Sequence, residues 1–157
     1  MPAARTDYRK GSPMTAFLER KTVADELANR ILQSGIAHAA EIDVPAVIAV
    51  VDDAGILKAF VRMDGAPLLS VQVAQDKAYT AAASGRSTDE WYDFIKDEPA
   101  LALGAPAGIE RLIVFGGGIP LLAGGAIVGA VGVSGAHYAR DMEIAAAAVR
   151  VMDDHTD

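Results

Sequence analysis

The stretch Val47-Ile-Ala-Val-Val51, followed by Asp52-Asp-Ala-Gly55 and Ile56-Leu-Lys-Ala-Phe-Val-Arg62, predicts a β-hairpin with a tight turn. The first arm is apolar at odd and even positions alike, whereas a strand with one face in water alternates apolar and polar side chains. Both faces of the predicted sheet must therefore be covered.

A second strand region is predicted near the C-terminus, where glycines separate the apolar runs 112–115, 119–122 and 126–133. Helices are predicted at 23–41, at 68–84, in a short segment after the capping box Ser87-Thr-Asp-Glu90, and at 141–152. The stretch 99–108 contains Pro and Gly and is expected to be a surface loop. Because the strands occur as adjacent pairs, we predict an α/β fold of the α+β type with a largely antiparallel sheet, in the order α-β-β-α-α-β-β-α.

Composition narrows the class of protein. The 157 residues are 52% apolar, which fits one domain at 15–157 after a polar, flexible arm at 1–14. Fourteen Lys and Arg against 21 Asp and Glu give 14 − 21 = −7, so nucleic acid and membranes are not expected as partners. The absence of cysteine excludes disulfides, cysteine nucleophiles and thiolate metal sites. No leader or membrane-length apolar run is found, so a cytoplasmic location is expected.

The partners expected are a small-molecule ligand and further copies of the chain. Three moderate helices cover one sheet face and part of the other. We therefore predict a homo-oligomer that buries the remaining apolar surface.

Lys77 is the most informative single residue. At about 100° per residue it lies on the same helical arc as Val73, Thr80, Ala81 and Ser84, where the core or a pocket is expected. A buried ammonium needs a carboxylate, carbonyl oxygens or water. Two interpretations stay open: a structural ion pair, or a catalytic group acting as an anion anchor, a base or a Schiff-base amine.

Arg62 and Asp64 lie at the exit of the second hairpin strand, just before the helix that carries Lys77. Arg62 is therefore a candidate ligand-binding residue, and Asp64 is a candidate partner for Lys77 in proton transfer. The alternative for Asp64 is a helix cap or a fixed Asp-Gly turn.

The triple glycine formed by Gly116, Gly117 and Gly118 leaves a strand end without side chains. Its N–H groups are candidates for binding a carboxylate or another anion, although hairpin geometry alone also accounts for such a motif. The pattern lacks the Gly-Lys-Ser/Thr of a nucleotide P-loop, so nucleotide binding is not expected.

The loop Ser134-Gly-Ala-His-Tyr-Ala-Arg-Asp141 concentrates polar side chains between the last strand and the last helix. His137 is a candidate acid/base or axial iron ligand, Tyr138 a phenolate ligand or hydrogen-bond donor, and Arg140 a carboxylate clamp. Ser134 is a further candidate for contact with the ligand. The alternative is an exposed loop in which Asp141 caps the helix.

Dedicated metal sites have no support in the sequence. His-x-x-x-His, Glu-x-x-His and calcium-loop patterns are all absent, so no metal ligand is predicted. His38 follows the apolar side of its helix and is expected to be a partly buried, hydrogen-bonded side chain.

Five blocks of the sequence resemble the GlcG/HbpS family, which includes the C-terminal domain of PduO-type corrinoid adenosyltransferases. The blocks are AVVDDAG (49–55), FVRMDGAP (60–67), AQDKAYTA (74–81), FGGGIP (115–120) and GAVGVSG (129–135). The resemblance implies a compact profilin-like or PAS-like fold, oligomers built from dimers and often octameric, and haem binding or degradation in some members. This chain departs from the family where His137, Tyr138 and Arg140 replace a small acidic loop.

We expect a pocket for a small oxygenated, carboxylated metabolite, with no cofactor required. Any catalysis would be proton transfer of the isomerase, hydratase or lyase type, with Lys77, Asp64 and His137 as the reacting groups. The alternatives are a haem-binding or haem-sensing protein, with iron held by His38, His137 or Tyr138, and a non-catalytic accessory subunit.

Overall fold

A computed structural model describes residues 16–155, so the arm predicted at 1–14 lies outside the described residues. The elements are α1 (Asp25–Glu41), β1 (Val47–Asp52), β2 (Leu57–Arg62), α2 (Ser70–Ser84), α3 (Thr88–Ile95), α4 (Pro99–Gly108), β3 (Gly118–Ala123), β4 (Ala126–Ser134), α5 (Tyr138–Val149) and the 3-10 helix η1 (Arg150–His155). None of the helices in this described part is long and apolar enough to cross a bilayer.

The four strands form one antiparallel sheet in the order β2-β1-β4-β3, which confirms the predicted sheet type and the predicted hairpin. In the hairpin, Ile48 pairs with Val61 and Ala49 pairs with Phe60. The C-terminal strand β4 lies beside β1 in the middle of the sheet, so both strands of this central pair are protected from water at their edges.

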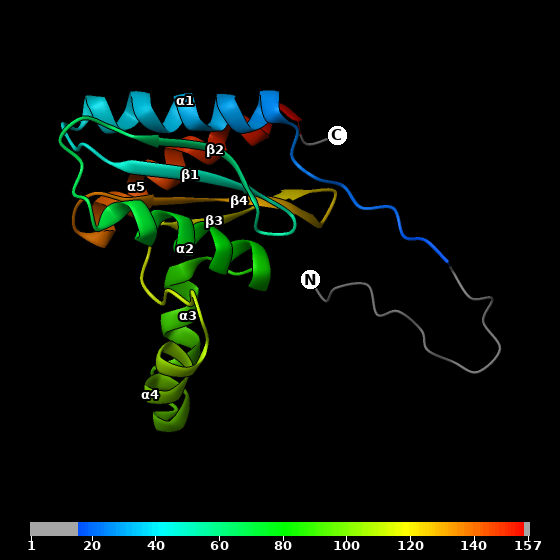
Figure 1. The fold of residues 1–157 in the computed structure, drawn as a ribbon, viewed down its shortest axis with the longest axis vertical. Helices are drawn as coiled ribbons and strands as arrows, with labels where there is room; N and C mark the ends of the chain where they lie inside the picture. Colours follow the sequence, from blue (N-terminus) through cyan, green and yellow to red (C-terminus); the bar gives the residue numbers. More distant parts are fainter. Residues whose placement is uncertain (1–15, 156–157) are drawn as a thin grey trace.

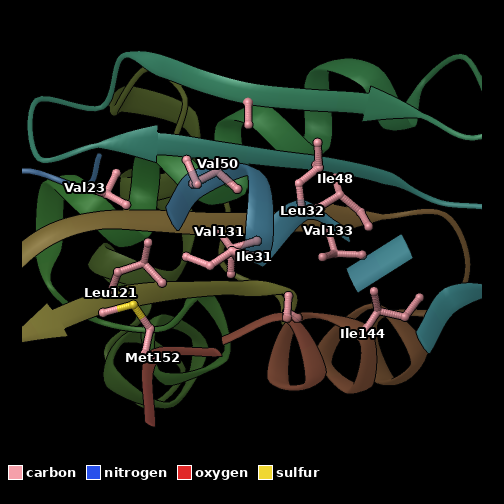
Figure 2. Close-up of a cluster of buried hydrophobic side chains, with 14 of the residues drawn as sticks. Val23, Ile31, Leu32, Ile48, Val50, Leu121, Val131, Val133, Ile144 and Met152 are labelled. Atoms are coloured by element: carbon pink, nitrogen blue, oxygen red, sulfur yellow. The ribbon is translucent and has the colours of Figure 1, made fainter. Parts of the chain in front are cut away.

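Helices cover both faces of the central strands. α1 and α5 pack on one face, and α2 packs on the opposite face across β4, β1 and β3 (Figure 1). Figure 2 shows Ile48, Val131 and Ile144 together in the core on the α1 and α5 side. Val47 and Ala49, which alternate with Ile48 along β1, instead pack against α2. This arrangement explains why β1 is apolar at every position.

Small residues let α2 approach the sheet closely. A Cβ atom added to Gly132 of β4 would collide with the carbonyl oxygen of Ala74 and would lie 2.5 Å from the backbone nitrogen of Ala78. Both atoms belong to the backbone of α2, so no side-chain rotation relieves the contact. The glycine is therefore required by the separation between helix and strand.

Two predicted elements are wrong. The stretch 99–108 is not a loop but helix α4, which begins with Pro99, a residue well suited to the first helical turn. The run 112–115 is not a strand. The Thr80 hydroxyl donates to the Arg111 carbonyl oxygen at 2.8 Å and accepts from the Ile113 amide at 3.0 Å, so this backbone bonds to α2 and not to a strand.

Helix boundaries also differ from prediction. The capping box at Ser87 and Glu90 is confirmed at the start of α3. The first helix starts at Asp25, two residues later than predicted, with Ala24 as its N-cap and no side-chain cap. The last helix starts at Tyr138, three residues earlier than predicted, because His137 caps it.

Candidate functional site

Lys77 belongs to α2, and its side chain is buried against the last strand, β4. Its side chain has 0% exposed surface, and Nζ donates to Asp141 Oδ2 and to the Val133 carbonyl oxygen, both at 2.8 Å. The partner is therefore Asp141 and not Asp64, which is exposed at its turn. The two partners are 64 positions apart in the chain, so only the folded sheet brings them together.

Asp141 connects this ion pair to the loop before α5. Its other carboxylate oxygen, Oδ1, accepts from the backbone N–H groups of Gly135 at 2.9 Å and Ala136 at 3.2 Å. The carboxylate also lies in the first turn of α5, where the helix dipole favours negative charge. Asp141 is not the N-cap, but it fixes the loop that presents His137.

Two effects shift the pKa of Lys77 in opposite directions. Burial lowers the pKa of the Lys77 ammonium, while the charge and the hydrogen bond of Asp141 act to raise it. A lowered pKa makes an amine a better nucleophile, yet Nζ has no access to solvent. The geometry thus favours the structural interpretation of Lys77.

The triple glycine packs tightly against this pair. Gly117 has a φ of 124°, and a Cβ there would lie 2.8 Å from Lys77 Nζ. The Gly118 amide donates to Thr88 Oγ1 at 2.9 Å, so this N–H is not free for an anion. Gly116 lies against the side chain of Met142. The motif is explained by close packing, with Gly116 alone of the three reaching a pocket.

A pocket of about 340 Å³ opens beside Gly116 of the triple glycine. It is lined by Asp89, Tyr92, Asp93, Val114, Phe115, Gly116 and Tyr138. Phe115 lines the pocket and also lies close to Lys77, whose Nζ is 5.0 Å from the ring centroid. The pocket wall is thus aromatic with two carboxylates, and no basic side chain lines it.

Tyr138 lines this pocket, and His137 lies next to Tyr138 without lining it. Their ring centroids are 4.3 Å apart, and both side chains are exposed. His137 Nδ1 accepts a long 3.3 Å hydrogen bond from the Ala139 amide, as the N-cap of α5. This loop, identified in the sequence as rich in polar residues, therefore reaches the pocket through Tyr138.

The other candidate residues lie elsewhere. Arg62 is exposed and donates to the Ala66 carbonyl oxygen at 3.4 Å. Ser134 is buried, with its hydroxyl 3.1 Å from that of Ser70. Arg140 is exposed and pairs with Glu143 at 2.9 Å. The structure therefore does not bring these three residues to the pocket.

Sequence reasoning missed five of the lining residues, which are Asp89, Tyr92, Asp93, Val114 and Phe115. Phe115 directly precedes the triple glycine, so a pocket predicted around that motif should have included Phe115 as a lining residue. Tyr92 and Asp93 come from α3, whose position over the loop depends on the Thr88 hydrogen bond to Gly118. No local pattern in the sequence indicates that bond.

His38 is satisfied by hydrogen bonds, as predicted. Its Nδ1 lies 3.2 Å from Glu41 Oε2, and its Nε2 lies 3.1 Å from Glu143 Oε1 on α5. The imidazole thereby connects α1 to α5 and has no free ring nitrogen for iron.

Glu143 gives this connection a pH dependence. Its pKa is lowered, first by the hydrogen bond from Arg140 and then by that of His38. Because the unfolded carboxylate takes up a proton first as the pH falls, the stabilisation is present above pH 4.5 and is lost as the pH passes through the lowered pKa. We expect Glu143→Gln to lower the urea midpoint at neutral pH, with the difference from wild type vanishing once the pH falls below the lowered pKa of Glu143.

The matched control for this measurement is Glu110→Gln, which changes an exposed glutamate that does not bond to His38 or Arg140. Its midpoint should follow that of the wild type at every pH. A difference between Glu143→Gln and wild type that stayed constant across the titration would contradict the proposed origin of the effect.

Comparisons with known proteins agree on one family. The model of a family described as "Haem degrading protein HbpS-like" matches residues 23–150. An uncharacterized 15.0 kDa protein of Citrobacter freundii, from the dhaT-dhaS intergenic region, is 35% identical over 82% of this chain and 90% of its own length. Protein GlcG of Escherichia coli K12 is 34% identical over 71% of this chain and 81% of its own length. A crystal structure of a PduOC:heme complex has a TM-score of 0.78 at 29% identity, covering 83% of this chain and 94% of that chain.

Proposed function

This chain belongs to the HbpS-like family, and from that premise we propose that it binds haem in the aromatic pocket beside Tyr138. The observation that carries the proposal is the pocket itself, whose wall contains Tyr92, Phe115 and Tyr138. Aromatic rings offer a flat apolar ligand large stacking surfaces. The structural relative in complex with haem has the same fold, which supports the choice of ligand.

The charges at the pocket argue against the carboxylated metabolite. Asp89 and Asp93 line it, whereas Arg62, Lys77 and Arg140 do not. A small carboxylate would therefore meet like charges without a compensating cation. A macrocycle places most of its surface against apolar walls and leaves its own carboxylates at the rim, so it suits this pocket better.

His137 and Tyr138 are the residues that we propose to hold the iron. Tyr138 lines the pocket, the ring centroid of His137 lies 4.3 Å from that of Tyr138, and both side chains are exposed. Imidazole and phenolate are established haem ligands. His137 would bind through Nε2 after releasing the weak bond that its Nδ1 accepts from Ala139, because Nδ1 then carries the proton. His38 has both ring nitrogens engaged by glutamates, so it is the least suited of the three candidates.

A haemin titration tests this proposal. We expect a saturable Soret shift at one haemin per chain, together with quenching of Trp91, the single tryptophan. His137→Ala should move the Soret maximum and weaken binding by about tenfold or more, because an axial ligand is lost. Comparison of His137→Ala with Tyr138→Phe shows whether the Tyr138 phenolate also contributes to haem binding.

The matched control is His38→Gln, which removes another histidine but keeps hydrogen-bonding groups between the glutamates. Its spectrum and affinity should equal those of the wild type. A wild type without saturable binding, or a spectrum unchanged in the His137→Ala/Tyr138→Phe double variant, would refute the assignment.

A further inference from the structure

We propose that the helical arm 88–110 of one copy of this chain docks on the exposed face of β2 in a second copy. The arm consists of α3, α4 and the residues that follow α4 directly, and it projects from the body of the molecule (Figure 1). The proposal concerns assembly and does not depend on haem binding. It rests on two exposed apolar surfaces and on their charges.

The first surface is α4. Its sequence, PALALGAPAG, contains no charged residue, and Ala105 is its single buried residue. Leu103 is 79% exposed, and Leu101 is also exposed. A helix that is apolar all round is normally buried inside a protein, and α3 is the main element against which α4 packs. Such a helix at the end of a projecting arm indicates a contact with another molecule.

The second surface is the β2 patch, formed by Phe60, Arg62, Leu68 and Leu69. In the sheet register Phe60 pairs with Ala49, whose side chain faces α2. α2 covers β1, β4 and β3, so this face of the edge strand β2 has no helix over it. Leu68 and Leu69, just before α2, are 73% and 78% exposed and extend the patch.

The net charges of the two surfaces favour contact between an arm and a β2 patch over contact between two arms. The arm carries six acidic residues and Lys96, a net charge of 1 − 6 = −5. Residues 57–69 carry Lys58 and Arg62 against Asp64, a net charge of 2 − 1 = +1. Two arms would repel each other, whereas an arm and a β2 patch attract at their rims and bury leucines between them. Because every copy carries both surfaces, a two-fold dimer makes this contact twice.

Cross-linking tests the contact directly, since the natural chain contains no cysteine. We expect the double variant Leu103→Cys/Leu69→Cys to form a covalent dimer with a short bis-maleimide reagent. Leu103→Cys alone should not, because arms do not face one another. The control pair Leu103→Cys/Leu122→Cys, with its second thiol on an exposed position of β3, should remain uncross-linked between chains.

Light scattering on the unmodified chain gives an independent readout. Leu103→Asp should at least halve the solution mass of the wild type, while Leu122→Asp should leave it unchanged. Both positions are exposed, so the variants are expected to fold, and circular dichroism checks this. A wild type with the mass of one chain, a Leu103→Asp variant of unchanged mass, or cross-linking of Leu103→Cys alone would each overturn the proposal.

Discussion

Lys77→Met is expected to lower the free energy of unfolding by about 3–5 kcal/mol, the usual penalty for removing one member of a buried ion pair. Methionine fills the space of the apolar stem, so the loss comes from the charge. Asp141 keeps its two amide donors but is left as a buried carboxylate without a cation. Urea unfolding at neutral pH, followed by circular dichroism, measures the change.

The double variant Lys77→Met/Asp141→Asn is the decisive control. It removes both charges, and the asparagine oxygen can still accept from the amides of Gly135 and Ala136. Replacing both members of a buried pair is often neutral or stabilising. We therefore expect the double variant to be more stable than Lys77→Met. A double variant whose loss equals the sum of the two single losses would show that the pair is not coupled.

Gly132→Ala is expected to destabilise the fold by about 3 kcal/mol or more, because overpacking here meets backbone atoms. The new methyl group would collide with the Ala74 carbonyl and lie 2.5 Å from the Ala78 nitrogen. α2 must then move away from β4, which opens the core around Ala130 and Val47. Denaturant midpoints and slopes of the variant and the wild type measure the effect.

Gly104→Ala is the matched control, with the same chemical change in helix α4. Apart from its two chain neighbours and the backbone of its own helix, no atom lies within 4 Å of a Cβ added at Gly104, so no packing contact opposes the methyl group. Alanine is the better helix former, and the substitution should stabilise α4 by roughly 0.5–1 kcal/mol. Opposite signs at the two glycines are therefore expected. Equal effects would mean that the contact between α2 and β4 does not decide the outcome.

The fold was predictable where the cause is local. The continuous apolar run of β1 indicated a strand covered on both faces, and Ser87 with Glu90 indicated the start of α3. The prediction failed at 112–115, where an apolar run has strand composition but its backbone bonds to Thr80 of α2. It also failed at α4, where proline and glycine were interpreted as loop residues although Pro99 occupies a favourable helical position.

The candidate site was predictable to a smaller extent. Helical phase alone placed Lys77 toward the interior, and the structure confirms that it is buried. Its partner was not predictable, because Asp141 is distant in sequence and lay where a helix cap was expected. The pocket depends on α3 crossing the loop before β3, which brings Tyr92 to Tyr138. Tertiary packing of this kind leaves no periodic signal in the chain.

The pairing of β1 with β4 also constrains how this chain folds during synthesis. Val47 pairs with Ser134, a separation of 134 − 47 = 87 positions, so one edge of the most apolar strand stays open until β4 has been synthesised. Loop-closure entropy delays such long-range pairing, and an open apolar edge favours aggregation of incomplete chains. C-terminal truncations before Ala126 should therefore accumulate in inclusion bodies, whereas the sheet closes once β4 inserts between β1 and β3.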